Sequence, residues 1–154
     1  MNTMVFSNRI TMSVGRPQNE GHLALGGHSL SCSAPAVMNG KGVGTNPEEL
    51  LISAVACCYS LTLAGVLQMR KLPATEIETS VEGVVIRDGS LHFDRITVSP
   101  TVRGADPGKE ENYRNAADAA RDRCFIGSTV KNSLSYTVGT VNLIEPEPAS
   151  RVAG

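Results

Sequence analysis

Two adjacent cysteines, Cys57 and Cys58, lie in the middle of a long uncharged stretch, and Cys124 follows much later in the chain. The thiolate form of cysteine is a nucleophile and a metal ligand, so these side chains are the first candidates for chemistry. The stretch from Leu50 to Met69 has no charged residue, which predicts a buried helix. A buried helix has no structural need for two neighbouring thiols, and this favours a reactive role for at least one of them.

Cysteine also serves in disulfide frameworks, in zinc sites and as a small buried hydrophobe. The N-terminal residues MNTMVFSNRI lack the apolar region of a secretion signal, which favours a cytoplasmic location and argues against structural disulfides. The chain has no CxxC pair and no tight cluster of histidine and cysteine, so we expect no metal site. Zinc would require Cys57, Cys58, Cys124 and a histidine to converge. Burial as a small hydrophobe is the expectation for Cys32, and it also fits Cys58 when that residue is considered alone.

Length and charge limit the possible classes of function. The 154 residues are enough for one domain with a proper core, which we expect over residues 1–144. Residues 145–154, EPEPASRVAG, have too little apolar content to fold and predict a flexible tail. The net charge of −1, from 14 basic and 15 acidic residues, gives no electrostatic footprint for nucleic acid or an anionic surface.

The long helix is predicted over residues 47–69, with clear start signals. Asn46 can cap the helix, and Pro47 suits its first position because the missing N–H would have no partner there. Glu49 can reach back as in a capping box, and both Glu48 and Glu49 lie at the positive helix end. Apolar side chains occur on every face, so we expect burial all round.

A membrane span is the alternative for this helix, because about 18 apolar residues are enough to cross a bilayer. No basic cluster flanks either end to set an orientation. Polar residues also interrupt the stretch: Ser53, Tyr59, Ser60, Thr62 and Gln68. We therefore expect a helix held between a sheet and a second subunit, and no membrane association.

Short alternating segments around this helix predict strands. Residues 3–16 contain two strand-like runs, and residues 22–34 contain two more around Gly26–Gly27, which is a hairpin signal. Alternation over residues 76–87 and 91–102, with a turn signal at Asp88–Gly89 between them, predicts a long antiparallel hairpin with one buried face.

A second helix is predicted after Asp106–Pro107, which repeats the cap-and-proline device. Its apolar face consists of Tyr113, Ala116, Ala117 and Ala120. Cys124 continues that face at i+11, so its thiol should point to the core. A short helical piece through Leu134 and a last strand over residues 136–144 complete an α+β fold.

The run GTNPEELLISAVACCYSLTL resembles the signature of the OsmC/Ohr family, the osmotically inducible and organic-hydroperoxide-resistance proteins. Asn46 to Leu50 matches closely, and Cys58 before an aromatic residue falls at the position of the family's peroxidatic cysteine. Cys124 falls where the family places its second cysteine, and Arg16, in a Val-Gly-Arg turn, resembles the arginine of the hydroperoxide-resistance branch. The resemblance implies antiparallel sheets around a long buried central helix.

The resemblance also implies a cysteine-based peroxidase without a bound cofactor. A thiolate on Cys58, stabilised by Arg16, would attack the O–O bond of a small organic hydroperoxide and become a sulfenic acid. Cys124 would then condense with it to a disulfide. An external dithiol, dihydrolipoamide or a lipoylated protein, would reduce that disulfide. Apolar neighbours such as Phe125 and Ile126 would favour alkyl hydroperoxides over hydrogen peroxide.

Glu48 lies ten residues before Cys58, which is about 15 Å along a continuous helix. It cannot touch that thiol within one chain. If two such helices cross about a two-fold axis, Glu48 of one chain can approach Arg16 and Cys58 of the other. This geometry, together with an all-round apolar helix, predicts an intertwined homodimer with composite sites. The plainer alternatives are a helix-end charge for Glu48 and a surface strand residue for Arg16.

Two positions depart from the family pattern. Cys57 stands where relatives have a small residue, and we expect it to be inert because it lies about 100° around the helix from Cys58. The second motif reads Cys124-Phe125-Ile126-Gly127 instead of Cys-Pro-[Val/Ile]-Ser. That departure supports an alternative function, a non-catalytic redox sensor or ligand-binding protein on the same fold. The sequence leaves open which branch of the family this is.

Overall fold

The computed structural model describes residues 3–15 and 19–148. The chain divides into two compact units, one up to Leu51 and one from Ile52 onwards, and each is described by itself. The long helix α1, Pro47–Met69, begins in the first unit and continues into the second.

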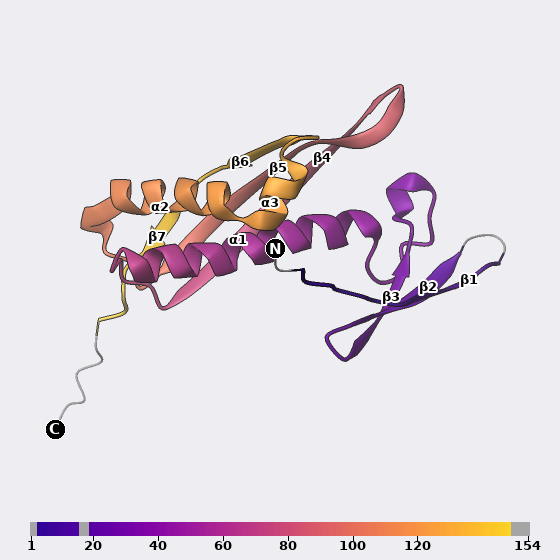
Figure 1. The fold of residues 1–154 in the computed structure, drawn as a ribbon, viewed down its shortest axis with the longest axis horizontal. Coiled ribbons are helices and arrows are strands. Elements are labelled where there is room, and N and C mark those ends of the chain that lie inside the picture. The colour runs from indigo at the N-terminus through magenta and orange to yellow at the C-terminus, as the bar shows by residue number, and fades with distance from the viewer. Residues whose placement is uncertain (1–2, 16–18, 149–154) are drawn as a thin grey trace. The chain divides into compact units, whose positions relative to one another are not determined.

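The first unit contains a three-stranded antiparallel sheet in the order β1-β2-β3 (Figure 1). Its strands are β1, Ile10–Ser13, β2, Glu20–Leu25, and β3, His28–Ser33. Gly26 and Gly27 form the turn of the predicted hairpin with φ of 54° and 82°, values that glycine adopts without steric cost. Of the two strands predicted over residues 3–16, only β1 is present among residues 3–15.

The segment between β3 and α1 holds the chain in a compact loop after the 3-10 turn η1, Ala36–Met38. Ser33 and Thr45 are joined by a backbone hydrogen bond of 3.1 Å from the Ser33 N–H to the Thr45 carbonyl. The Ser33 hydroxyl accepts from the Val43 N–H at 2.8 Å. These bonds satisfy the loop backbone and bring it to the start of α1.

Helix α1 has the predicted bounds. The Asn46 side-chain oxygen accepts from the Glu49 N–H at 2.8 Å, as a helix cap does. The Glu49 carboxylate accepts from the Thr45 hydroxyl at 3.2 Å. The cap, the proline and two acidic residues in the first turn thus begin the helix where the sequence indicated.

In the single chain α1 is buried on one side, so its burial all round, which was expected to involve a second subunit, stays a prediction. One side of the helix enters the core through Val55, Tyr59 and Leu63. On the other side, Leu61 is 72% exposed and Met69 is 64% exposed. By length and composition α1 could also cross a membrane, a test that core helices of soluble proteins pass as well.

The second unit contains a mixed sheet, so the expectation of purely antiparallel sheets is wrong here. Strands β4, Glu76–Asp88, and β5, Ser90–Arg103, form the predicted hairpin through Gly89. Strands β6, Ser135–Val138, and β7, Asn142–Ile144, both pair with β5 in parallel. The pairing is parallel because the helices after β5 carry the chain back along that strand before β6 begins. Such a crossover lets the next strand run in the same direction as β5.

The single last strand predicted over residues 136–144 is divided in two. The β6 register with β5 ends at Val98 and the β7 register begins at Thr101. Pro100, which has no N–H to donate to a ladder, lies in this gap of β5.

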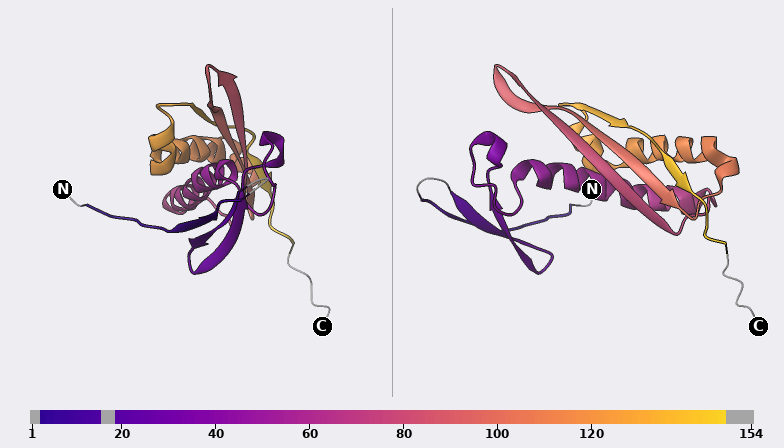
Figure 2. Two further views of the ribbon diagram at one scale, coloured as in Figure 1. Left: turned by 90° about the vertical axis from the view of Figure 1, so that its right-hand side faces the viewer. Right: turned by 180° about the vertical axis from the view of Figure 1, so that it is seen from behind.

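The helices of the crossover are α2, Glu110–Arg123, and α3, Phe125–Val130, preceded by the 3-10 turn η2, Pro107–Lys109. They lie with α1 on one face of the mixed sheet (Figure 2). Alanines at 116, 117 and 120 are fully buried on the side of α2 that faces the core. The Tyr59 hydroxyl of α1 donates to the Ala117 carbonyl of α2 at 3.3 Å. This packing brings the Cys58 region of α1 next to the junction of α2 and α3.

Candidate active site

Cys58 and Cys57 occupy different environments on α1. Cys58 is half-buried and packs against the core cluster, whereas Cys57 is exposed. Both line the same open pocket. Successive helix residues are turned by about 100°, so only one of two neighbours can face the core. The structure turns Cys58 inward.

Cys124 is fully buried, as the sequence predicted, but it does not lie on the helix that was expected to carry it. Helix α2 ends at Arg123, and Cys124 has extended backbone angles, φ −64° and ψ 111°, between α2 and α3. Its sulfur accepts a hydrogen bond from the Gly127 N–H at 3.3 Å. The thiol therefore caps the first turn of α3 and is held in a fixed position.

Cys58 packs against the buried cluster to which Cys124 belongs, and the Cys58 thiol acts on the pKa of Cys124. Burial raises the pKa of the Cys124 thiol above its ordinary range, and the Gly127 N–H opposes that shift. The neighbouring Cys58 thiol raises the pKa of Cys124 further, because it interacts with the protonated thiol and because two negative charges would repel. Packing of α1 against the α2–α3 junction has thus brought together two thiols that are far apart in sequence.

Two tyrosines complete the surroundings of this thiol pair. Tyr59 of α1 and Tyr136 of β6 both have a pKa raised by burial, so both hydroxyls keep their protons. The Tyr136 hydroxyl opposes the rise in the pKa of Cys124, because it can donate to the thiolate form of that side chain. Arg121 of α2 interacts electrostatically with both tyrosines. Sequence analysis did not identify Tyr136, because a single tyrosine in a short strand is an ordinary core residue.

An apolar pocket of about 470 Å³ opens beside the thiols. Phe125 and Ile126, the apolar neighbours expected from the sequence, form part of its wall together with the largely exposed Leu61. Its other lining residues are Ala54, Cys57, Cys58 and Thr62. A small molecule with an alkyl or aryl group could therefore reach Cys58 from this side.

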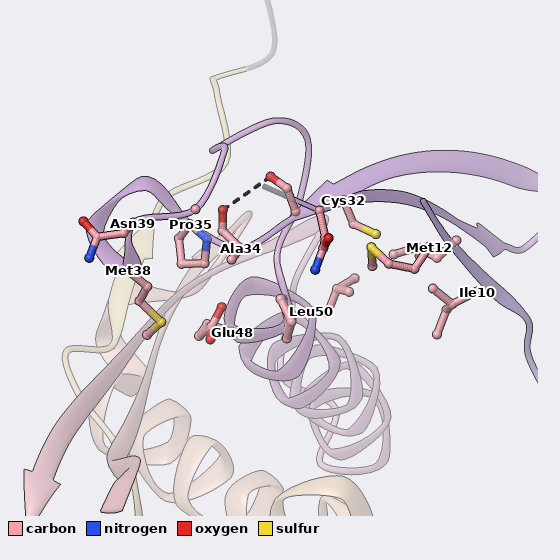
Figure 3. A pocket seen from close by; sticks show the side chains of 14 residues that line it. Ile10, Met12, Cys32, Ala34, Pro35, Met38, Asn39, Glu48 and Leu50 are labelled. Carbon is pink, nitrogen blue, oxygen red and sulfur yellow. Dashed lines mark hydrogen bonds between the residues drawn. The ribbon is translucent and has the colours of Figure 1, made fainter. Parts of the chain in front are cut away.

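Glu48 belongs to the first unit and lines a different pocket, of about 620 Å³. Met38 and Glu48 lie towards one side of this pocket, and Met12 and Ile10 lie towards the other (Figure 3). The Glu48 Oε2 atom is buried and has no hydrogen-bond partner among the described residues. A buried carboxylate oxygen without a partner is costly, so a donor is expected to complete this pocket. Arg16, the predicted donor, lies outside the described residues.

A family model described as OsmC-like protein matches residues 39–139, more than half of the chain. The chain belongs to the OsmC-like family. The matched segment contains Cys58, Cys124 and Tyr136, and it confirms the resemblance inferred from the signature around Cys58.

This OsmC-like protein is also similar to one curated protein and to several solved structures. The uncharacterised protein YmaD of Bacillus subtilis (strain 168) is 34% identical over 124 residues, covering 78% of this chain and 83% of YmaD. The OsmC-like protein of Mycoplasma pneumoniae has a TM-score of 0.72 at 18% identity, over 92% of this chain and 100% of the other. The organic hydroperoxide resistance protein OhrB of Bacillus subtilis has a TM-score of 0.64 at 20% identity, over 90% and 98%. The two structural likenesses show a shared α+β fold with a central helix.

The structure explains why the second OsmC-like motif of this chain ends in glycine. A Cβ atom added at Gly127 would lie 2.2 Å from Cε1 of the Tyr136 ring, which is closer than any real contact. The tyrosine ring thus fills the space that a serine side chain would need. Gly127 and Tyr136 are a matched pair.

We therefore expect Gly127→Ser, which restores the serine of the family pattern, to destabilise this chain by about 1–3 kcal/mol through overpacking. Urea unfolding measures the loss of free energy of unfolding. In a double-mutant cycle with Tyr136→Val, which shortens the opposing side chain, most of that loss should disappear. Equal losses in both backgrounds would contradict the proposed fit.

Proposed function

We propose that this OsmC-like protein is a thiol-dependent peroxidase that reduces organic hydroperoxides to alcohols in oxidative stress defence. The observation that carries the proposal is the juxtaposition of the Cys58 and Cys124 thiols beside an apolar pocket. Two thiols within interaction distance can store the two electrons that a hydroperoxide takes up. The organic hydroperoxide resistance protein OhrB, which has the same fold, supports the proposed reduction of organic hydroperoxides.

In the first step, the Cys58 thiolate attacks the outer oxygen of the hydroperoxide. A sulfur–oxygen bond forms, the O–O bond breaks, and the alkoxide takes a proton to leave as an alcohol. Cys58 is then a sulfenic acid. Cys58 is half-buried and the apolar pocket lies on its open side. This position suits the alkyl or aryl group of an organic hydroperoxide better than the second hydroxyl group of hydrogen peroxide.

In the second step, the Cys124 thiolate attacks the Cys58 sulfur. A disulfide forms, the sulfur–oxygen bond breaks, and the hydroxide takes the proton that Cys124 gave up, leaving as water. A small external dithiol such as dihydrolipoamide, free or carried on a protein, then exchanges with the disulfide and restores both thiols. We propose the cytoplasm as the site of action, because the cycle needs a reducing compartment.

A second subunit is part of this proposal. The exposed apolar side of α1 and the unpaired Glu48 oxygen both favour an intertwined homodimer, in which Arg16 would meet Glu48 and Cys58 in a composite site. Arg16 would stabilise the thiolate and the departing alkoxide. Light scattering of the detergent-free protein should give twice the mass of one chain. A monomer, or a protein that needs detergent to stay in solution, would contradict the homodimer.

The proposed function is tested by steady-state turnover of cumene hydroperoxide with dihydrolipoamide, and with hydrogen peroxide as the comparison substrate. We expect many turnovers per chain and a clear preference for the organic hydroperoxide. Oxidation that stops after one equivalent would instead favour the second candidate, a redox sensor. The raised pKa of Cys124 is the observation that favours the sensor, because it slows disulfide closure and prolongs the sulfenic acid.

The pH dependence of disulfide closure follows from the same pKa shift. Because burial raises the pKa of Cys124, the attacking thiolate is a small fraction at neutral pH and grows as the pH rises. The closure rate should therefore increase about tenfold per unit between roughly pH 6 and 8. The titratable groups facing Cys124 are Cys58, Tyr59 and Tyr136, and both tyrosines stay protonated in this range. Single-turnover mixing with acid quench measures the rate, and a flat or falling profile would contradict this expectation.

A further inference from the structure

The Tyr136 hydroxyl is a buried donor without a partner in the described part of the reduced protein. Tyr136 is 9% exposed, and its hydroxyl oxygen is inaccessible to solvent and makes no hydrogen bond there. The other two tyrosines differ in this respect. The Tyr59 hydroxyl donates to the Ala117 carbonyl, and the Tyr113 hydroxyl donates to the Pro73 carbonyl at 2.6 Å. A buried hydroxyl left unpaired costs about 1–3 kcal/mol, so its retention calls for an explanation.

The Tyr136 ring is placed against the turn that holds Cys124. Its ring carbons lie where a side chain at residue 127 would be, and the N–H of that same Gly127 donates to the Cys124 sulfur. Gly127 thus lies in contact with the Tyr136 ring and the Cys124 thiol at once. The Tyr136 hydroxyl and that thiol interact, and each shifts the pKa of the other.

A neutral thiol is a weak hydrogen-bond acceptor, whereas a thiolate is a strong one. The unpaired hydroxyl therefore gains a partner when Cys124 ionises. Burial of Tyr136 keeps its proton in place, so tyrosine remains the donor and the thiolate the acceptor. The Gly127 N–H supplies a second donor to the same sulfur.

We infer that Tyr136 is a catalytic residue of this chain: its hydroxyl donates a hydrogen bond to the Cys124 thiolate and so prepares the resolving thiol for attack on oxidised Cys58. In the closing step the Cys124–Cys58 bond forms, the sulfur–oxygen bond of the sulfenic acid breaks, and the proton lost by Cys124 leaves in water. Tyr136 keeps its own proton throughout. When an external dithiol attacks the Cys58 sulfur of the disulfide, the same hydroxyl receives the departing Cys124 thiolate.

The role in turnover rests on the proposed peroxidase function, but the hydrogen bond can be tested without any peroxide. Tyr136→Phe removes the hydroxyl and keeps the ring that fits Gly127. In the reduced protein, labelling of Cys124 by methyl methanethiosulfonate, followed by mass spectrometry, reports the thiolate at each pH. We expect the labelling profile to move to higher pH in Tyr136→Phe. An unchanged profile would overturn the inference, whether or not the wild-type protein reduces hydroperoxides.

Kinetics give the second readout. After one equivalent of cumene hydroperoxide, Tyr136→Phe should form the Cys58 sulfenic acid at the wild-type rate but close the disulfide about 10- to 100-fold more slowly, the loss expected for a hydrogen bond to a charged group. A dimedone adduct on Cys58 should accumulate accordingly. Closure at the wild-type rate would overturn the inference. A wild-type protein that never oxidises at Cys58 would refute the proposed function and leave the labelling result to decide on Tyr136.

Stability separates this role from a merely structural one. Removing an unpaired buried hydroxyl should leave the thermal midpoint unchanged or raise it. The matched control is Tyr113→Phe, which removes a buried hydroxyl that has partners at Pro73 and Asp106. That variant should lower the midpoint and leave the labelling profile of Cys124 unchanged. A shift of the Cys124 profile in Tyr113→Phe equal to that in Tyr136→Phe would show a general loosening and overturn the inference.

Discussion

Cys58→Ser is expected to lose hydroperoxide turnover by roughly 10³-fold or more, as removal of an essential nucleophile does, whereas Cys57→Ala keeps most of it. The physical reason is the orientation of two neighbours on α1. Cys58 packs towards the core and interacts with the Cys124 thiol, while Cys57 is exposed. Serine retains the shape of the cysteine side chain but its hydroxyl does not ionise at neutral pH, so it supplies neither nucleophile nor redox centre. Steady-state kinetics with cumene hydroperoxide and dihydrolipoamide measures both variants.

Cys57→Ala is the matched control, because it removes a thiol from the adjacent position of the same helix and the same pocket. Circular dichroism and thermal unfolding should show both variants folded. If Cys57→Ala loses turnover and Cys58→Ser retains it, the assignment of the peroxidatic cysteine is wrong. Loss in both variants would indicate that the pair acts together.

One equivalent of alkyl hydroperoxide is expected to remove two free thiols per chain and to join Cys58 to Cys124. Both thiols are held on packed elements, α1 and the α2–α3 junction, and they already interact in the reduced protein. A disulfide requires Cα atoms within about 7 Å and a narrow range of angles, which packed elements can maintain. Thiol counting followed by non-reducing peptide mapping identifies the pair.

Cys124→Ser tests the same step from the other side. Its Cys58 sulfenic acid should persist and react with dimedone, and only one thiol should be lost per equivalent. Cys32→Ala is the matched control, because Cys32 is a buried cysteine of the first unit and takes no part in the proposed cycle. A bond between Cys57 and Cys58, or one between two chains, would refute the predicted pairing. A stable sulfenic acid in the wild-type protein would favour the sensor.

Local signals determined the elements of this protein from sequence. Asn46 and Pro47 define the start of α1, and the hairpin of β4 and β5 follows from alternation and from the turn at Asp88–Gly89. Each of these signals acts over a few residues, through a cap, a missing N–H or a backbone angle. The same holds for the candidate thiols, since the run around Cys58 is a contiguous motif.

Tertiary structure alone decided the directions of pairing and the composition of the site. Strands β6 and β7 run parallel to β5 because two helices intervene. The direction of a strand depends on the connection before it and cannot be predicted from the residues of that strand alone. Helix α1 has apolar residues on every side, and only the packed chain shows which of them it leaves exposed. Tyr136 gained its place beside Cys124 because Gly127 leaves room for its ring, a contact between residues of α3 and β6 that forms only after the crossover packs on the sheet. The thiols themselves could be identified in the sequence, but their proximity depends on the packing of α1 against α2, where the Tyr59 hydroxyl donates to the Ala117 carbonyl.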